Sequence, residues 1–161
     1  MQRGDSPRDD EETAGEAPAG AVSLDMDVPL HDVDPLNVVW HGHYFKYFDR
    51  ARTELLRAHD LDVPDLVTLR HGMFIVDAGC RYISPLTYGD KFRVSAWLTS
   101  IDPRIRVAYA VWNVTKNRRS ARAYTVLVTT DTDGRLLWQT PEEIRRRLGA
   151  GATHGERTRP A

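Results

Sequence analysis

One stretch, residues 32–49, holds most of the side chains that could do chemistry: three aspartates, two histidines and a run of aromatics. Within it, Asp34 lies in an apolar-flanked turn just upstream of an expected helix. A helix start presents free backbone N–H groups and the positive end of the dipole, which can polarise a carbonyl oxygen and hold the oxyanion that follows attack. A carboxylate beside it can attack the carbonyl carbon or activate a water. Asp34 and a helix start thus predict the two halves of a hydrolytic site.

The same residues also have structural interpretations. Asp34, or Asp32, could only cap the turn. His41 could orient Asp34 or a water molecule, or it could be a capping or solvent-facing histidine. His41 and His43 lie two residues apart rather than at the helical spacing of a metal pair, and no third ligand is nearby in the sequence. We therefore expect no metal site.

Asp49 lies further along the same helix, where it could meet a polar group of a substrate. Its structural interpretation is a local ion pair with Arg50 or Arg52. The sequence contains no glycine-rich phosphate loop, no Gly-x-Ser-x-Gly elbow and no Cys–His pairing. Carboxylate chemistry is therefore the chemistry that these residues favour.

The composition is that of an ordinary globular protein, with 41% apolar and 28% charged residues in a chain of 161. That length suits one domain with a proper core. The net charge of −1 provides no global field for nucleic acid or an anionic membrane. The single cysteine, Cys80, excludes an internal disulfide and a multi-cysteine metal cluster, and its apolar neighbours predict a buried thiol. We expect a cytoplasmic protein, because no apolar run approaches the roughly 18 residues of a membrane span and no signal peptide is evident.

Hydrophobic periodicity predicts one strand, a long helix, a short helix and then a run of strands. Alternation begins at Ser23, and a helical pattern opens at Gly42 or His43 and runs to about His59. The later elements are a short helix, five strands and a terminal helix, expected over residues 62–70, 73–84, 91–101, 105–111, 121–130, 135–139 and 143–148. Meandering strands after one helix predict the α+β class, with an antiparallel sheet of about five strands and the long helix on one face.

The expected domain covers residues 22–148. Residues 1–21 are rich in Asp, Glu, Gly, Ala and Pro, so we expect a disordered tail there, with an acidic docking arm as the alternative. Residues 149–161 are expected to form a second disordered tail. Within the long helix, Tyr44, Phe48, Ala51 and Leu55 form one apolar stripe, which Tyr47 broadens, and Lys46 falls on the solvent side.

Three further local predictions concern the later elements. One face of the strand expected over residues 73–84 carries Phe74, Val76, Ala78, Cys80 and Tyr82. Residues 131–134, beginning with Asp131, predict a hairpin turn. Thr140 is expected to cap the terminal helix.

Residues 32–54 closely resemble the signature of hotdog-fold thioesterases of the 4-hydroxybenzoyl-CoA thioesterase and short-chain acyl-CoA thioesterase type. That signature runs Asp-x-Asp, a small residue, an apolar pair, aromatic-His or aromatic-Tyr, x-x-Tyr, and an acidic residue before Ala-Arg. The matching residues are Asp32-Val33-Asp34, Asn37, Val38-Val39, Trp40-His41, Tyr44 and Asp49-Arg50-Ala51-Arg52-Thr53-Glu54. Residues 81–90 and 141–144 also look like the family, so the likeness covers roughly residues 23–148.

The resemblance implies a hotdog fold, in which an antiparallel sheet wraps a long central helix. It implies a homodimer or a tetramer of dimers, with the site at the subunit interface and an acyl group carried by coenzyme A or an acyl carrier protein. Asp34 would be the nucleophile or general base, the N–H of His41 would polarise the thioester carbonyl, and the His41 side chain would assist a water. No cofactor is implied. The expected substrate-binding residues are Asn37, Val39, Trp40, Tyr44 and Asp49.

Two departures from the family pattern bear on these expectations. Asn37 replaces a glycine common in that turn; asparagine tolerates the same left-handed backbone, but its side chain could narrow the pocket entrance. Leu30 stands where short-chain relatives often carry Tyr, so their substrate choice does not transfer. The alternative is a non-catalytic hotdog module that binds acyl-CoA. A hotdog dehydratase is a weaker alternative, because its His-plus-acid site has a different sequence context.

Overall fold

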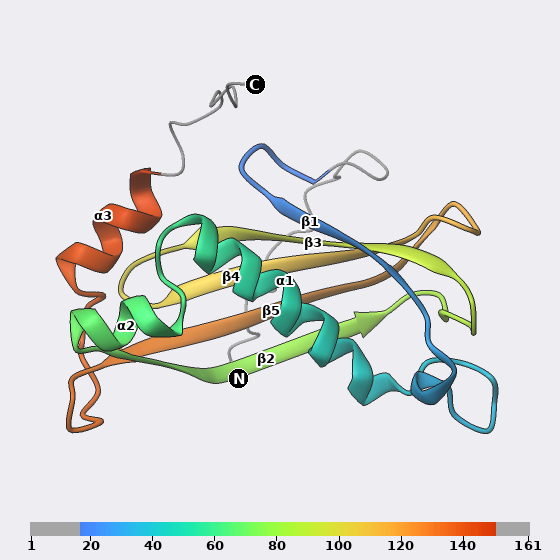
Figure 1. Ribbon diagram of the computed structural model, residues 1–161, viewed down its shortest axis with the longest axis horizontal. Helices are drawn as coiled ribbons and strands as arrows, with labels where there is room; N and C mark the ends of the chain where they lie inside the picture. Colours follow the sequence, from blue (N-terminus) through green and yellow to red (C-terminus); the bar gives the residue numbers. More distant parts are fainter. Residues whose placement is uncertain (1–16, 151–161) are drawn as a thin grey trace, which may run out of the picture.

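A single antiparallel sheet and one long helix make up most of the computed structural model, which describes residues 17–150 (Figure 1). The five strands lie in the order β1-β3-β4-β5-β2. In chain order the elements are β1 (Val22–Asp27), the 3-10 turns η1 (Leu30–Asp32) and η2 (His41–His43), α1 (Tyr44–Ala58), α2 (Val63–Leu69), β2 (Gly72–Tyr82), β3 (Lys91–Ser100), β4 (Ile105–Asn113), β5 (Arg118–Thr130) and α3 (Glu142–Ala150). The predicted α+β class, antiparallel sheet and long helix are confirmed.

Helix α1 lies across one face of the sheet, as Figure 1 shows, and its apolar stripe is buried there. Phe48, Ala51 and Leu55 are almost fully buried, and Phe48 stacks at an angle on Tyr109 of β4 with ring centroids 4.9 Å apart. The odd-numbered residues of β4 are buried and the even-numbered ones are half-buried, so one face of this central strand points at the helix. Burying each large apolar side chain contributes roughly 1.5–3 kcal/mol, so this stripe holds the helix on the sheet.

The predicted side-chain alternation of β2 is wrong in its first half. Phe74, Val76, Ala78, Cys80 and Tyr82 were expected on one face, but a β-bulge shifts the register between Ile75 and Asp77. The bulge adds one residue to β2, so Phe74 and Tyr82 fall on opposite faces of the sheet. The far edge of β2 has no partner strand among the described residues, because β2 ends the strand order.

The segment after β5 also differs from its predicted form. Asp131 makes the expected turn, but residues 135–139 meet β5 only through the bridge between Thr130 and Leu136 and the bond from Leu137 N–H to the Thr129 carbonyl. Thr140 was expected to cap the last helix; instead its hydroxyl donates to the Pro103 carbonyl (3.4 Å). Thr140 is buried, and its N–H donates to Asp102 Oδ1 (3.0 Å), so this residue packs on the β3–β4 turn instead of continuing along β5.

Both predicted tails lie mainly outside the described residues. Residues 17–21 make a turn before β1, and α3 continues to Ala150, two positions past the expected end of the domain. Within residues 17–150, no helix is long and apolar enough to cross a membrane. Cys80 is half-buried against the core rather than fully enclosed.

Candidate active site

Asp34 lies in a small hairpin, residues 33–39, which leads through η2 into the first turn of the long helix. Its two arms meet at the bridge between Val33 and Val39, and the Asp34 N–H donates to the Val38 carbonyl (2.8 Å). Asn37 closes the turn with φ 61°, which confirms the predicted left-handed backbone. A second bridge joins Val38 to Thr87, so the hairpin is pinned to the loop before β3. The hairpin therefore presents Asp34 on a braced turn rather than on a free loop.

The Asp34 carboxylate uses only one oxygen to hold this turn. Its Oδ1 accepts hydrogen bonds from the N–H groups of Leu36 (2.8 Å) and Val38 (3.5 Å), which is the turn-capping arrangement that the sequence allowed. Its other oxygen has no hydrogen-bond partner among residues 17–150. Capping and chemistry are thus compatible, because the free oxygen remains available to a substrate or a water.

The start of the helix supplies unpaired backbone donors. Turn η2 leads directly into α1, and no oxygen of the described chain accepts from the N–H groups of His41 and Gly42. Tyr82, at the end of β2, donates its hydroxyl proton to the His41 carbonyl (2.6 Å). Burial raises the pKa of Tyr82 to about 12, so this proton stays on the hydroxyl at neutral pH. The turn is thereby fixed to the sheet with its N–H groups available.

Trp40 covers the helix start from outside. Its indole packs edge-on to His43 (5.1 Å between centroids) and at an angle to His41 (4.9 Å), and 45% of the residue is exposed. A Cβ on Gly42 would lie 2.1 Å from Cζ3 of this indole, so only glycine leaves room for the ring. Trp40 is therefore placed to meet a ligand that approaches the free N–H groups.

Replacing Gly42 with alanine should displace the Trp40 ring while leaving the fold intact. The added Cβ overlaps the indole, and a half-exposed side chain can swing away at little cost, so we expect the free energy of unfolding to change by less than about 1 kcal/mol. The indole N–H signal of Trp40, assigned with Trp40→Phe, should shift in the NMR spectrum. Gly149→Ala is the control, since nothing lies within 4 Å of its added Cβ. An unmoved Trp40 signal in Gly42→Ala would contradict this packing.

The remaining predicted site residues divide between the core and the surface. Tyr44 is 2% exposed and meets the Tyr82 ring edge-on (5.0 Å), and Val39 is also a core residue. His41 contacts neighbouring rings and makes no hydrogen bond to Asp34. Asp49 is exposed and pairs with Arg52 (2.7 Å), the local ion pair that the sequence allowed. Substrate contact by these residues stays a prediction, and the structure gathers all of them except Asp49 at the junction of hairpin and helix.

A buried carboxylate beside the site was missed by the sequence reasoning. Asp32 is 3% exposed, and its side chain accepts hydrogen bonds from Lys46 Nζ (2.8 Å) and the Tyr47 hydroxyl (2.6 Å). Lys46 was expected on the solvent side and Tyr47 only in the apolar stripe. In the sequence, Asp32 precedes Lys46 by fourteen residues and Tyr47 by fifteen. This separation does not predict a contact by itself, because the three side chains meet only after the chain folds back on itself.

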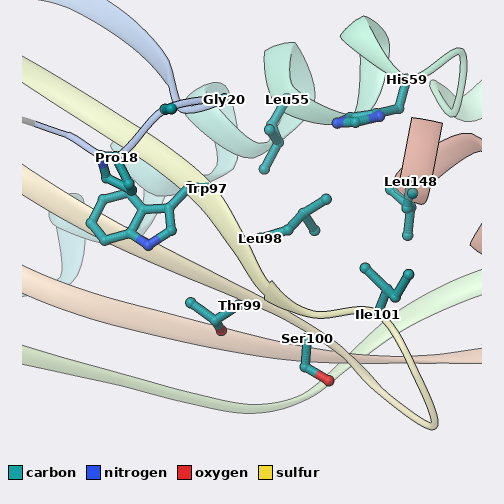
Figure 2. Close-up of a pocket in the computed structure, with 12 residues that line it drawn as sticks. Pro18, Gly20, Leu55, His59, Trp97, Leu98, Thr99, Ser100, Ile101 and Leu148 are labelled. Atoms are coloured by element: carbon teal, nitrogen blue, oxygen red, sulfur yellow. The ribbon is translucent and has the colours of Figure 1, made fainter. Parts of the chain in front are cut away.

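A hollow lies at the other end of α1, away from the hairpin, and is shown in Figure 2. Its volume is about 350 Å³, and its walls include Leu55, Trp97, Leu98 and Leu148. His59 also lines the hollow, and its Nδ1 donates to the Arg147 carbonyl (2.9 Å). No aspartate or glutamate is among the described residues that line the hollow. None of the predicted site residues contributes to it, so the hairpin junction remains the candidate site. Within residues 17–150, no group of His, Cys, Asp and Glu is arranged to hold a metal ion.

Comparison with solved structures defines the class of fold. A 4-hydroxybenzoyl-CoA thioesterase bound to 4-hydroxybenzoyl-CoA superposes with a TM-score of 0.72 at 17% identity, over 81% of this chain and 99% of that one. A Staphylococcus aureus protein in complex with CoA superposes with a TM-score of 0.74 at 16% identity, over 87% and 89%. The architecture is the hotdog fold, as the sequence resemblance predicted.

The family model of the thioesterase-like superfamily matches residues 28–148, which include the hairpin, the long helix and strands β2 to β5. This chain belongs to that superfamily. The acyl-CoA thioester hydrolase YbgC of Escherichia coli is 30% identical over 74 residues, covering 46% of this chain and 55% of that protein. The chain thus spans about half the length of the curated relatives that it matches.

Proposed function

We propose that this protein hydrolyses an acyl thioester carried by coenzyme A or an acyl carrier protein. Asp34 acts as nucleophile or general base, and the N–H groups at the start of α1 polarise the thioester carbonyl. The observation that carries the proposal is the free oxygen of Asp34 on a hairpin that runs directly into the unpaired N–H groups of His41 and Gly42. A carboxylate and two oriented donors are the parts that attack on a carbonyl requires.

Membership of the thioesterase-like superfamily supports the reaction class. The name of the YbgC relative and the acyl-CoA ligand of the 4-hydroxybenzoyl-CoA thioesterase point to the same kind of substrate. Trp40 is the side chain best placed to contact the acyl group, since it is half-exposed over the helix start.

We further propose that the active form is a homodimer or a tetramer of dimers. The edge of β2 has no partner among the described residues, and Phe74, Ile75 and Val76 along it are about half exposed. An unpaired strand edge with apolar side chains readily adds another strand. A second copy of this chain would cover that edge, and Tyr82 at its end would bring the interface beside the helix start.

The test is a panel of acyl-CoA thioesters, short aliphatic, long aliphatic and aromatic, with release of free CoA thiol followed by a colorimetric reagent. At least one substrate should reach a kcat/KM of roughly 10⁴ M⁻¹s⁻¹ or more, the lower range for enzymes on their own substrates. The same acyl groups on an acyl carrier protein distinguish the two carriers. Ligand-dependent thermal stabilisation with no thiol released from any substrate would instead support the acyl-CoA-binding module.

A further inference from the structure

Asp32 has an unusual environment for a charged side chain. It is 3% exposed, and both of its carboxylate oxygens are bound from α1: Oδ1 by Lys46 Nζ (2.8 Å) and Oδ2 by the Tyr47 hydroxyl (2.6 Å). The Nε2 atoms of His31 and His43 lie 3.7 and 3.9 Å from Oδ1. These four groups come from the hairpin entry and the first turns of the helix.

The backbone of the same residue belongs to the hairpin. The Asp32 carbonyl accepts from the Trp40 N–H (3.0 Å), which closes the hairpin at its base. Asp34 follows two residues later on the same arm. The backbone of Asp32 thus belongs to the hairpin arm that carries Asp34. Its side chain binds the helix that begins beside the unpaired N–H groups.

Stability alone does not account for this arrangement. Removing a carboxylate from water costs several kcal/mol, and a buried ion pair often contributes no more stability than apolar residues of the same shape. Lys46 is half exposed and could be solvated without Asp32, and a cation in the first turn of a helix opposes the helix dipole. Two directed hydrogen bonds from adjacent residues do, however, define the position of the carboxylate relative to the helix.

Asp32 carries its negative charge at neutral pH. Burial acts to raise the pKa of the carboxyl, but the hydrogen bonds from Lys46 and Tyr47 outweigh it and hold the pKa below its usual value. Burial and the hydrogen bond to Asp32 raise the pKa of Tyr47, so that hydroxyl remains a donor.

We propose that Asp32 is a positioning residue, which acts through Lys46 and Tyr47 to hold Asp34 in register with the unpaired N–H groups at the start of α1. The inference rests on the proposed function. Asp32 does not itself touch the reacting atoms. A displacement of about 1 Å between a catalytic group and its partners can cost about 100-fold in rate, so loss of this contact should appear in kcat.

The kinetic test compares Asp32→Asn, Tyr47→Phe and Lys46→Met with the wild-type protein on its best substrate from the panel. Asp32→Asn should lower kcat about 10- to 100-fold with KM changed less than about threefold, and Tyr47→Phe should have a smaller effect of the same kind. The double variant Asp32→Asn/Tyr47→Phe should lose little more than Asp32→Asn alone, because both changes break one contact. Tyr47→Phe removes a single hydroxyl and keeps the test available if Asp32→Asn does not fold.

The matched control is Asp62→Asn, which breaks an ion pair with Arg57 (2.8 Å) at the other end of α1. It should leave kcat and KM unchanged. Wild-type kcat and KM in folded Asp32→Asn and Tyr47→Phe would overturn the positioning role. A raised KM with an unchanged kcat would also overturn it, since that outcome describes substrate binding.

A structural readout separates this inference from the proposed function. Amide hydrogen exchange should become at least tenfold faster at the N–H groups of Asp34 and Trp40 in Asp32→Asn, and stay unchanged at Ile144 in α3. Unchanged exchange at the hairpin would refute positioning whatever the activity. If the wild type releases no thiol but exchange is faster in Asp32→Asn, the thioesterase is refuted. The role of Asp32 in holding the hairpin would still stand.

The same variant has a defined pH signature. The folded pKa of Asp32 lies below its unfolded value of about 3.9, so its stabilisation is present above that pH and is lost as pH falls through the folded pKa. The melting temperature of the wild type should therefore fall more steeply below about pH 4 than that of Asp32→Asn. Parallel curves for the two proteins would show that folding does not lower the pKa of Asp32.

Discussion

Asp34→Asn is expected to lower kcat for thioester hydrolysis by about 10³-fold or more, with the fold intact. Asparagine cannot serve as the nucleophile or as a general base, so the reaction loses the group that attacks or activates water. Its side-chain oxygen can still accept from the N–H groups of Leu36 and Val38, so the turn keeps its cap. The measurement is thiol release under single-turnover and steady-state conditions, together with the melting temperature.

A matched control exists elsewhere in the chain. Asp131 Oδ1 accepts from the N–H groups two and four residues ahead, those of Asp133 and Arg135, both at 2.9 Å. This is the same turn-capping pattern as that of Asp34, at a turn that contains none of the site residues. Asp131→Asn should have wild-type kcat and KM. Full activity in folded Asp34→Asn would eliminate Asp34 as the reactive carboxylate, and an equal loss in Asp131→Asn would attribute the effect to turn capping.

If the proposed oligomer forms through the free edge of β2, Val76→Lys should give a monomer and lower kcat/KM at least about tenfold. Val76 lies at the bulge on the free edge of β2 and is 53% exposed in the single chain. A lysine on a strand edge places a charge where a second strand would pair, which is a common way in which natural proteins block edge association. The substitution adds no bulk to the core, so the monomer should stay folded. Light scattering during gel filtration gives the mass, and the thiol assay gives the activity.

Val114→Lys is the control for this second experiment. Val114 is 48% exposed, close to the value for Val76, but it follows β4 in the turn before β5. It should keep both the oligomer and the activity. A dimer that survives Val76→Lys would place the interface away from the β2 edge. A fully active monomer would show that the site does not need a second copy.

Local patterns were enough to predict the elements that position the site. The four apolar residues spaced along residues 44–55 lie on one face of α1 because helical geometry alone brings them together. The turn at Asn37 was also predictable, since few residues other than glycine and asparagine adopt φ near 61° at low cost. Period-two alternation placed β1, β3, β4 and β5 for the same kind of reason. Such features depend on neighbours within a few positions along the chain.

Features that join distant segments could not be predicted in this way. The bulge in β2 depends on its pairing with β5, and the short contact after residue 134 depends on how Thr140 packs against the β3–β4 turn. In both cases the backbone conformation depends on a partner far away in the sequence, so local propensities do not predict it.

The position of Asp34 in a turn before a long helix follows from the order of neighbouring residues. The environment of Asp32 depends instead on contacts between segments that lie apart in the sequence. Asp32 is buried because the hairpin folds back and brings it within hydrogen-bond distance of Lys46 and Tyr47. Contacts across a chain reversal depend on three-dimensional closure, and that closure is what brings the site together.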